Sequence, residues 1–489
     1  MLGRRAATLG AAALPFLASG RAAVQEPGTP AFADVERVRD LVRRRMSPWI
    51  QDAKDRLGEE VEDSRGVDRL FDALRTEMWD ILREEVRGTR VGIVLLPPPP
   101  RKEGPEEKPP DSAPARASAA VRHFEGRYGT HRARLRSAEG GSGTEEAVAR
   151  ALEWLVSHQD PDGRWDCDGF SKQCTEPCGG PGLALHDVGV SGLALLALLG
   201  DGNLPDVGPQ RRAVARGIKW LRSQQNAESG LIGEPVGTAF LYGHAIATIA
   251  LGEAYAATGS VDLRGPLERA VALIEKARNP DGAWRYSAKP IGDNDTSVTA
   301  WMAIALKAAE EAGVAVDPRS FEGALKWLDD MTDPASGRCG YQAKGEPSSR
   351  RKGEETRFPH DKTEALTAAA LYCRVRLGRA PRKDPLLRAH ADRLRKVLPV
   401  WEASPEACPV DEYYWFYGSL AMFQMGGEDW RVWNAALKKA LLEHQRRDGD
   451  AAGSWDPIGA WGKDGGRVYS TALGALCLET YYRHPRRAN

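Results

Sequence analysis

The chain has 489 residues, and its 68 lysines and arginines are balanced by 68 aspartates and glutamates, so its formal net charge is zero. Without a net field, binding of nucleic acid or of an anionic membrane through bulk charge is disfavoured. Apolar residues make up 42% of the chain, but no uninterrupted apolar run approaches the roughly 20 residues of a membrane-spanning helix. Composition therefore predicts a soluble or peripheral protein with a substantial core.

The first 23 residues have the layout of an export signal. Arg4 and Arg5 precede a mildly apolar stretch that runs to Leu17, and small residues follow as far as Ala23. This order is typical of a secretory signal peptide, and the paired arginines suggest the twin-arginine type. We therefore expect a signal peptide over residues 1–23 and a location in the periplasm or cell envelope. The alternative is a disordered, Ala-rich tail.

Residues 34–96 and 97–143 differ sharply in composition. The first range is charged and helix-prone, with apolar residues such as Leu70 and Leu74 at helical spacing. It predicts amphipathic helices that could dock on the main domain or on a partner. The second range opens with four consecutive prolines and stays polar to its Gly-rich end. We interpret it as a linker, because it has few apolar residues to bury and its prolines lack backbone donors.

From residue 144 to the end of the chain one pattern recurs. It combines an amphipathic helix, a turn rich in Pro, Asp or Gly, and usually an aromatic residue, at residues 151–165, 217–231, 271–284, 324–341 and 440–455. In Asp160-Pro-Asp-Gly163 the proline stops the helix, the aspartate favours the turn and the glycine accepts positive φ. The aromatic residue after the turn, here Trp165, can fold back and pin the loop.

A more apolar helix follows each of these units, and one less typical amphipathic helix at 386–400 completes the alternation. The apolar helices are expected at residues 188–199, 239–257, 297–309, 365–377, 413–425 and 468–482. Helices that are apolar on all faces must be surrounded by protein. Six of them inside six amphipathic ones predict an all-α (α/α)6 toroid of six helical hairpins over residues 144–489. An open solenoid would satisfy the same pattern.

A Gln-x-x-x-Gly-x-Trp pattern begins at Gln159, and a looser copy ends at Trp455. It resembles the QW repeat of squalene-hopene and oxidosqualene cyclases. The whole repeat region resembles the prenyltransferase and squalene-oxidase repeats, and in particular a group of exported bacterial proteins that carry this repeat domain alone. The segments Asp411-Glu-Tyr-Tyr-Trp-Phe-Tyr-Gly418 and Gly465-Gly-Arg-Val-Tyr-Ser-Thr471 are similar to segments expected in that group. The resemblance implies a single squalene-cyclase-like toroid.

The segment Asp293-Asn-Asp295-Thr296-Ser297 precedes the third apolar helix and resembles the DxDD motif of class II terpene cyclases. In that motif the central acid protonates a C=C bond or an epoxide, which requires neighbours that keep the acid protonated. The resemblance implies catalytic roles for Asp295, as proton donor, and Asp293, in a terpene-cyclase-like isomerase. Two features depart from the family: Thr296 replaces the last aspartate, and squalene cyclases use two helical domains. The alternative is that Asp295, Thr296 or Ser297 caps the helix.

All six apolar helices should run in the same direction, so their N-termini share one rim. The candidate binding residues at this rim are His186, Asp187, Tyr242, His244, Asp293, Asp295, His360, Asp361, Glu364, Asp411, Glu412, Tyr413, Tyr414, Arg467 and Tyr469. Acids at helix N-termini commonly serve as caps, but this group would also suit a binding site. Tryptophans, Trp301 among them, could line an apolar cavity or pack between helices.

Three of the seven cysteines, Cys167, Cys174 and Cys178, lie in one loop, and His186 follows. Thiolates and an imidazole could bind zinc, whereas a disulfide would suit an exported protein. Free thiols are the third possibility. Because the spacing lacks a Cys-x-x-Cys pair, we assign no metal and no cofactor.

Two classes of function follow. The first is a cyclase-like enzyme or binding protein that holds an isoprenoid or another apolar small molecule in the barrel cavity. The second is a non-catalytic exported module that binds a peptide, glycan or lipid at the polar rim. Neither class calls for nucleic acid or a transmembrane span.

Overall fold

The computed structural model describes residues 124–402 and 408–486. The predicted signal peptide, the amphipathic region at 34–96 and most of the linker lie outside these residues. In the described part, none of the helices combines the length and the apolarity that a membrane span needs.

Within the described residues, twelve long helices alternate between the outside and the inside of a ring. The outer helices are α7 (Ser142–Ser157), α9 (Arg211–Ser223), α11 (Val261–Ala277), α13 (Pro318–Met331), α15 (Pro385–Leu394) and α17 (Gly427–Leu442). The inner helices are α8 (Asp187–Gly200), α10 (Phe240–Thr258), α12 (Thr296–Glu311), α14 (Ala365–Arg376), α16 (Glu412–Met425) and α18 (Gly462–Arg483). A short antiparallel hairpin, β1 (Thr332–Asp333) and β2 (Arg338–Cys339), follows α13.

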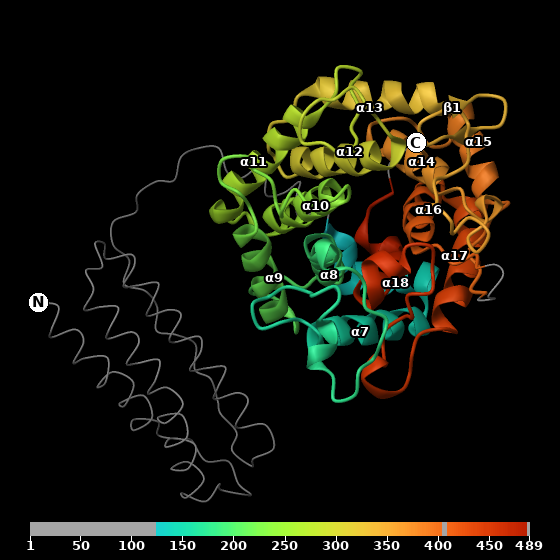
Figure 1. Ribbon diagram of the computed structural model, residues 1–489. Helices are drawn as coiled ribbons and strands as arrows, with labels where there is room; N and C mark the ends of the chain where they lie inside the picture. Colours follow the sequence, from blue (N-terminus) through green and yellow to red (C-terminus); the bar gives the residue numbers. More distant parts are fainter. Residues whose placement is uncertain (1–123, 403–407, 487–489) are drawn as a thin grey trace, which may run out of the picture. The chain divides into compact units, whose positions relative to one another are not determined.

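The ring is closed. Each inner helix packs against the next one along the chain, and the last, α18, packs against the first, α8 (Figure 1). In the outer layer, α17 likewise contacts α7. The predicted (α/α)6 toroid is therefore confirmed, and an open solenoid is excluded because its terminal helices would not meet.

Burial follows the two kinds of helix that the sequence distinguishes. Every residue of α8 from Val190 to Gly200 is buried, whereas α13 buries only Ser320, Ala324 and Leu328 of its 14 residues. Those three lie four residues apart, on one face of the helix. An inner helix is thus surrounded by neighbours, while an outer helix contacts the ring through one stripe.

The glutamine of the QW pattern links its own turn to the following outer helix. Gln159 Nε2 donates to the carbonyl of Gly163 in its own turn, at 2.8 Å, and to the carbonyl of Ala213 in α9, at 3.0 Å. The Trp165 indole NH donates back to the carbonyl of Leu155 at 2.6 Å. The pattern is therefore a structural link between consecutive hairpins, which explains why it recurs with the fold.

The same link joins the last hairpin to the first. Gln445 Nε2 donates to the carbonyl of Gly453 at 2.8 Å and to that of Ala147 in α7 at 2.7 Å. Arg150 donates to Gln445 Oε1 at 2.8 Å. Gly453, with φ of +93°, lies so close to the Arg150 carbonyl that a Cβ atom would come within 2.3 Å of its oxygen. We call this junction of the last and first hairpins the seam.

The end of the predicted linker at 97–143 is not a linker. It forms three short helical segments, η1 (Glu125–Arg127), α6 (Gly129–Leu135) and η2 (Arg136–Gly140). Arg127 is buried and donates to Glu253 at 2.7 Å, and Arg132 pairs with Asp201 at 2.6 Å. The segment looks like a linker in composition because its anchors are charged side chains, whose acidic partners lie far away in the sequence.

Candidate functional site

A chamber of about 460 Å³ opens in the bore at the rim where the inner helices begin. Apolar side chains from four inner helices form much of its wall, among them Leu193, Ile246, Leu366 and Leu473. We call it the rim chamber. Five of the predicted site residues line it, namely His186, Tyr242, Trp301, Tyr413 and Tyr469.

An aromatic cluster lies at the inner end of the rim chamber. The Trp301 ring stacks on Phe416, with centroids 5.8 Å apart, and meets Tyr417 edge-on at 5.2 Å. Tyr413 also meets Tyr417 edge-on, at 5.2 Å. Trp301 lines both the rim chamber and a second, smaller cavity deeper in the bore. The cluster therefore divides the bore in two.

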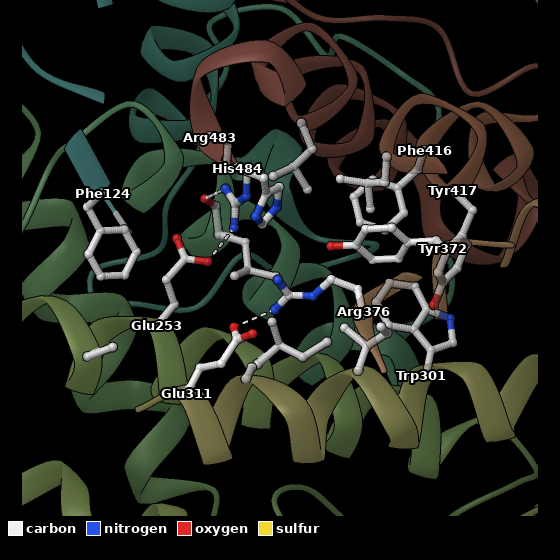
Figure 2. Close-up of a pocket in the computed structure, with 17 residues that line it drawn as sticks. Phe124, Glu253, Trp301, Glu311, Tyr372, Arg376, Phe416, Tyr417, Arg483 and His484 are labelled. Carbon is white, nitrogen blue, oxygen red and sulfur yellow. Dashed lines mark hydrogen bonds and ion pairs between the residues drawn. The ribbon is translucent and has the colours of Figure 1, made fainter. Parts of the chain in front are cut away.

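The deeper cavity, of about 270 Å³, contains buried ion pairs (Figure 2). Arg376 pairs with Glu311 at 2.5 Å, and Arg483 pairs with Glu253 at 2.7 Å. Phe124, from the segment before α6, also lines this cavity. Because its charges are paired with one another, and Glu253 also binds Arg127 of the segment before α6, they have a structural explanation. The rim chamber is thus the better candidate site.

Asp295 caps α12 and is fully buried. Its Oδ1 accepts a hydrogen bond from the Val298 amide at 2.8 Å, and its Oδ2 accepts one from the Tyr341 hydroxyl at 3.3 Å. Burial raises the pKa of Asp295 to about 7, against the opposing effects of the Val298 amide and of Arg285, whose Nε lies 3.6 Å away. The predicted capping role is therefore present, and it coexists with an acid that can hold a proton at neutral pH.

Two tyrosines lie between Asp295 and the rim chamber. The Tyr341 hydroxyl contacts both Asp295 and the Tyr286 hydroxyl, and Tyr286 lines the chamber. Thr296 positions Tyr341, because its amide donates to the Tyr341 carbonyl at 3.0 Å and its hydroxyl donates to the Gly340 carbonyl at 2.6 Å. The threonine that departs from the DxDD pattern thus anchors the loop after β2. Asp295 itself does not line the chamber.

Asp293 lies outside the chamber as well. Its carboxylate is ion-paired with Arg285 and accepts a hydrogen bond from Gln342 Nε2 at 3.1 Å. Its side chain is about half exposed, at 46%. The position predicted as the first acid of the motif is therefore a partly exposed member of an ion pair, held near Asp295 by their shared neighbour Arg285.

The charged groups that line the chamber are already paired. Arg350 pairs with Asp411 at 2.8 Å, and Arg351 pairs with Asp464 at 2.9 Å. Burial lowers the pKa of His186 below its usual value, which favours a neutral imidazole at pH 7. The chamber therefore offers a ligand hydroxyl groups, aromatic faces and apolar walls in a nearly neutral environment.

Two other predicted site residues are structural. His244 Nδ1 accepts a hydrogen bond from the Ile232 amide at 3.1 Å, and burial lowers the pKa of His244 to about 4. The Tyr414 hydroxyl donates to the Val397 carbonyl at 2.7 Å. Both side chains tie an inner helix to an adjacent loop instead of facing the chamber.

Glu364 and Arg467 are also engaged away from the chamber. Glu364 forms ion pairs with Arg338, at 2.8 Å, and with Arg393. Arg467 pairs with Asp456 at 2.7 Å. With Asp411 paired to an arginine, these residues show that much of the predicted polar rim consists of ion pairs and caps.

Sequence reasoning missed Tyr286, Tyr341 and the two arginines of the chamber. Tyr341 occupies the place of the aromatic residue that follows each repeated turn, where it is expected only to pin a loop. Arg350 and Arg351 lie in the long loop between β2 and α14. A search for aromatic hydroxyls near the DxDD-like segment could have singled out Tyr286, nine residues before Asp295.

The predicted cysteine cluster forms with a different histidine. Cys174 Sγ lies 3.0 Å from Cys178 Sγ and 3.2 Å from His158 Nε2. Cys167 is buried, and its thiol contacts the Gly465 carbonyl at 3.3 Å. His186 lines the rim chamber. The close group of metal-ligating atoms therefore consists of His158, Cys174 and Cys178, and it includes neither Cys167 nor His186.

No protein-family model and no curated protein matches the sequence. Among solved structures, an inactive variant of the α-1,6-mannanase GH76A of Salegentibacter in complex with α-1,6-mannotriose covers 69% of this chain and 99% of its own, with 12% identity and a TM-score of 0.47. The type II terpene cyclase MstE from Scytonema covers 69% and 98%, with 16% identity and a TM-score of 0.44. A D-mannose isomerase covers 69% and 96%, with 14% identity and a TM-score of 0.46. The chain is thus distantly similar to proteins of different activities, and the toroid assignment rests on the helix packing described above.

Proposed function

We propose that the rim chamber binds a neutral, isoprenoid-sized apolar molecule. The observation that carries this proposal is a chamber of about 460 Å³ with apolar walls and the Trp301 cluster at its inner end. This volume falls in the range of about 300–1,000 Å³ that is usual for small-molecule sites. Such sites are mostly apolar and carry a few polar groups, here Ser297 and several tyrosines, that orient the ligand.

The charges around the chamber favour a hydrocarbon or an alcohol over a diphosphate. Arg350 and Arg351 are each engaged with a carboxylate, so a diphosphate would have to displace Asp411 or Asp464. Leaving either of these carboxylates unpaired in a partly buried site is costly. A ligand that needs only hydroxyl and aromatic contacts avoids this cost.

Exposed apolar side chains at the chamber mouth support a lipid ligand. Leu183 and Leu185 line the chamber and remain 41% and 47% exposed, and Val236, next to the lining residue Gly237, is 60% exposed. Large apolar side chains exposed together often mark a binding site. A glycan or peptide at the polar rim is less favoured, because Glu364 and Asp411 are paired within the protein.

Binding can be tested by calorimetric titration with farnesol, geranylgeraniol, squalene and geranylgeranyl diphosphate. Leu193→Trp should fill the chamber and weaken binding at least about tenfold, a loss of about 1.4 kcal/mol. Val261→Trp, at an 84% exposed position on α11, is the matched control and should bind as the unaltered protein does. The proposal fails if none of these compounds binds, or if folded Leu193→Trp protein binds normally. Tighter binding of the diphosphate than of the alcohol would contradict the neutral ligand.

A second candidate, acid-initiated isomerisation of the bound ligand, is favoured by the hydrogen-bonded chain from Asp295 to the chamber. We propose that protonated Asp295 gives its proton to Tyr341, Tyr341 gives its own to Tyr286, and Tyr286 protonates a C=C bond. The alkene electron pair forms the new C–H bond, and the faces of Trp301 and Tyr413 stabilise the carbocation. Loss of another ligand proton back along the chain restores Asp295 and leaves an isomer.

Product analysis separates catalysis from binding. With squalene or geranylgeraniol as substrate, Asp295→Asn and Tyr286→Phe should each lower turnover by about 10²-fold or more, the usual contribution of a positioned acid, while ligand binding persists. Tyr255→Phe, on α10 and away from the chamber lining, is the matched control and should retain turnover. If the unaltered protein forms no product although it binds ligand, the catalytic candidate fails and the binding proposal stands.

A further inference from the structure

The loop after α7 brings three metal-ligating side chains together outside the rim chamber. Cys174 Sγ lies 3.0 Å from Cys178 Sγ and 3.2 Å from His158 Nε2, and Cys178 Sγ lies 3.6 Å from the same nitrogen. All three ligand atoms fall within 4.8 Å of one another. We propose that His158, Cys174 and Cys178 bind a Zn²⁺ ion.

The triangle formed by these atoms fits one zinc ion. Zn–S bonds are about 2.3 Å long and Zn–N bonds about 2.1 Å. With the observed separations, a point about 1.1 Å off the plane of the three atoms, on either face, lies at bonding distance from all of them. A tetrahedral S–Zn–S angle places the two sulfur atoms about 3.8 Å apart, so zinc binding would move them about 0.8 Å farther from each other. No fourth His, Cys, Asp or Glu ligand joins this group in the described part of the chain. The fourth tetrahedral position would thus be available to a water molecule.

His158 is oriented as a zinc ligand should be. Its Nδ1 lies 2.7 Å from the Trp154 carbonyl, to which it donates when it carries the ring proton. This tautomer leaves the Nε2 lone pair directed at the two sulfur atoms. The ring is also held by stacking on Trp154, with centroids 4.1 Å apart, and by an edge contact with Phe170. The imidazole is therefore fixed before any metal binds.

The ligand types select zinc over other common cations. Two thiolates and one imidazole suit zinc, whereas magnesium and calcium prefer oxygen ligands. A neighbouring group supplies such oxygens, with Asp166 and Asp168 in the same loop and Asp187 at the start of α8. However, Lys172 and Arg164 already form ion pairs with Asp166, at 2.6 and 3.3 Å. Those cations account for the acidic group without a metal.

Zinc at this position would fix a loop that crosses the seam of the ring. The Glu176 amide donates to the Asp450 carboxylate at 2.8 Å, and Arg467 Nε donates to the Gly179 carbonyl at 2.9 Å. The loop continues to Leu183, whose amide donates to the Asp464 carbonyl at 2.8 Å. Because Leu183 lines the rim chamber, the ion would join the end of α7 to a wall of that chamber.

The experiment uses the full chain purified without chelators. Elemental analysis should find about one zinc per chain, and Co²⁺ exchanged into the site should give a thiolate-to-metal charge-transfer band. Cys174→Ser, Cys178→Ser and His158→Ala should each lose the zinc and the band. Cys408→Ser is the matched control, because this buried thiol contacts the Ile458 carbonyl near another part of the rim. It should retain both signals.

Thermal melting supplies a readout independent of metal content. A chelator should lower the Tm of the unaltered protein and of Cys408→Ser by several degrees and leave that of Cys178→Ser unchanged, because a ligand stabilises only the state that binds it. Since His158 is buried, the conservative Cys178→Ser variant keeps the test valid if His158→Ala does not fold. Zinc retained by all three variants would overturn the proposal. If the protein purified without reductant contains no zinc, and its mass is two hydrogens lower than that of the reduced chain, Cys174 and Cys178 form a disulfide instead.

Discussion

Asp295 and Glu412 are buried carboxyls at the start of two inner helices, and they differ in their partners. Asp295 accepts hydrogen bonds through both oxygens. Glu412 Oε1 accepts one from the Ser470 hydroxyl at 2.9 Å, whereas its Oε2 has no hydrogen-bond partner among the described residues. Burial raises the pKa of each to about 7. Both are therefore expected to change protonation near neutral pH.

Glu412 should make the protein less stable as pH rises. Because its pKa is about 7 in the folded state and about 4.3 in an unfolded chain, the folded state holds more protons between these values. The free energy of unfolding should then fall across that window, by up to about 4 kcal/mol, and level off above pH 7. In Glu412→Gln, which can keep the Ser470 hydrogen bond, the part of this decrease that is due to Glu412 should be absent, while the part due to Asp295 remains. Urea unfolding of both proteins at pH 5 and pH 8 measures the difference, and equal pH dependence would show that Glu412 does not hold the proton.

The sequence predicts the location of a site residue when that residue lies at the start of a helix, because the order of the helices along the chain then determines its place at the rim. His186, Tyr242 and Tyr413 reach the chamber because they begin inner helices. Tyr286 and Tyr341 could not be placed in the same way, since their contact depends on how two loops pack. His158 was missed for a related reason: it ends an outer helix, and its approach to Cys174 and Cys178 depends on the path of the intervening loop.

At the scale of the helix, the repeated glutamine adds a hydrogen-bonded connection between hairpins to the packing of the inner helices. Gln159 and Gln445 each donate to two carbonyls, one in their own turn and one in the neighbouring outer helix. The sequence pattern predicts the turn and the alternation of helices, because both depend on local residue types. It does not reveal the bridging hydrogen bonds, and it misassigned residues 125–140, whose partners are on distant inner helices.

Gln445→Ala tests whether the seam is closed. The substitution leaves the Ala147 and Gly453 carbonyls without this donor in a buried position, so the free energy of unfolding should fall by about 2–4 kcal/mol. Gln159→Ala, within the ring, makes the equivalent change and should cost about the same. Chemical denaturation of the two variants provides the comparison. A much smaller loss for Gln445→Ala would indicate that α7 and α17 are not joined in solution.

For the whole molecule, closure of the ring determines where a ligand could bind. Six inner helices that begin at one rim place their first turns around a single mouth, and the Trp301 cluster divides the bore beneath it. The alternation of helices predicts the ring and its rim. It cannot predict a chamber volume or the pairing of Arg350 and Arg351, because these depend on side chains that meet across the bore.

A crystal structure of the protein with bound geranylgeraniol would test the proposed binding site most directly. We expect the hydrocarbon chain in the rim chamber against Leu193 and Ile246, with its inner end on the Trp301 ring and its hydroxyl near the mouth. Arg350 and Arg351 should keep their carboxylate partners. Ligand bound in the deeper cavity or on the outer face of the ring, with the rim chamber empty, would contradict the proposed site.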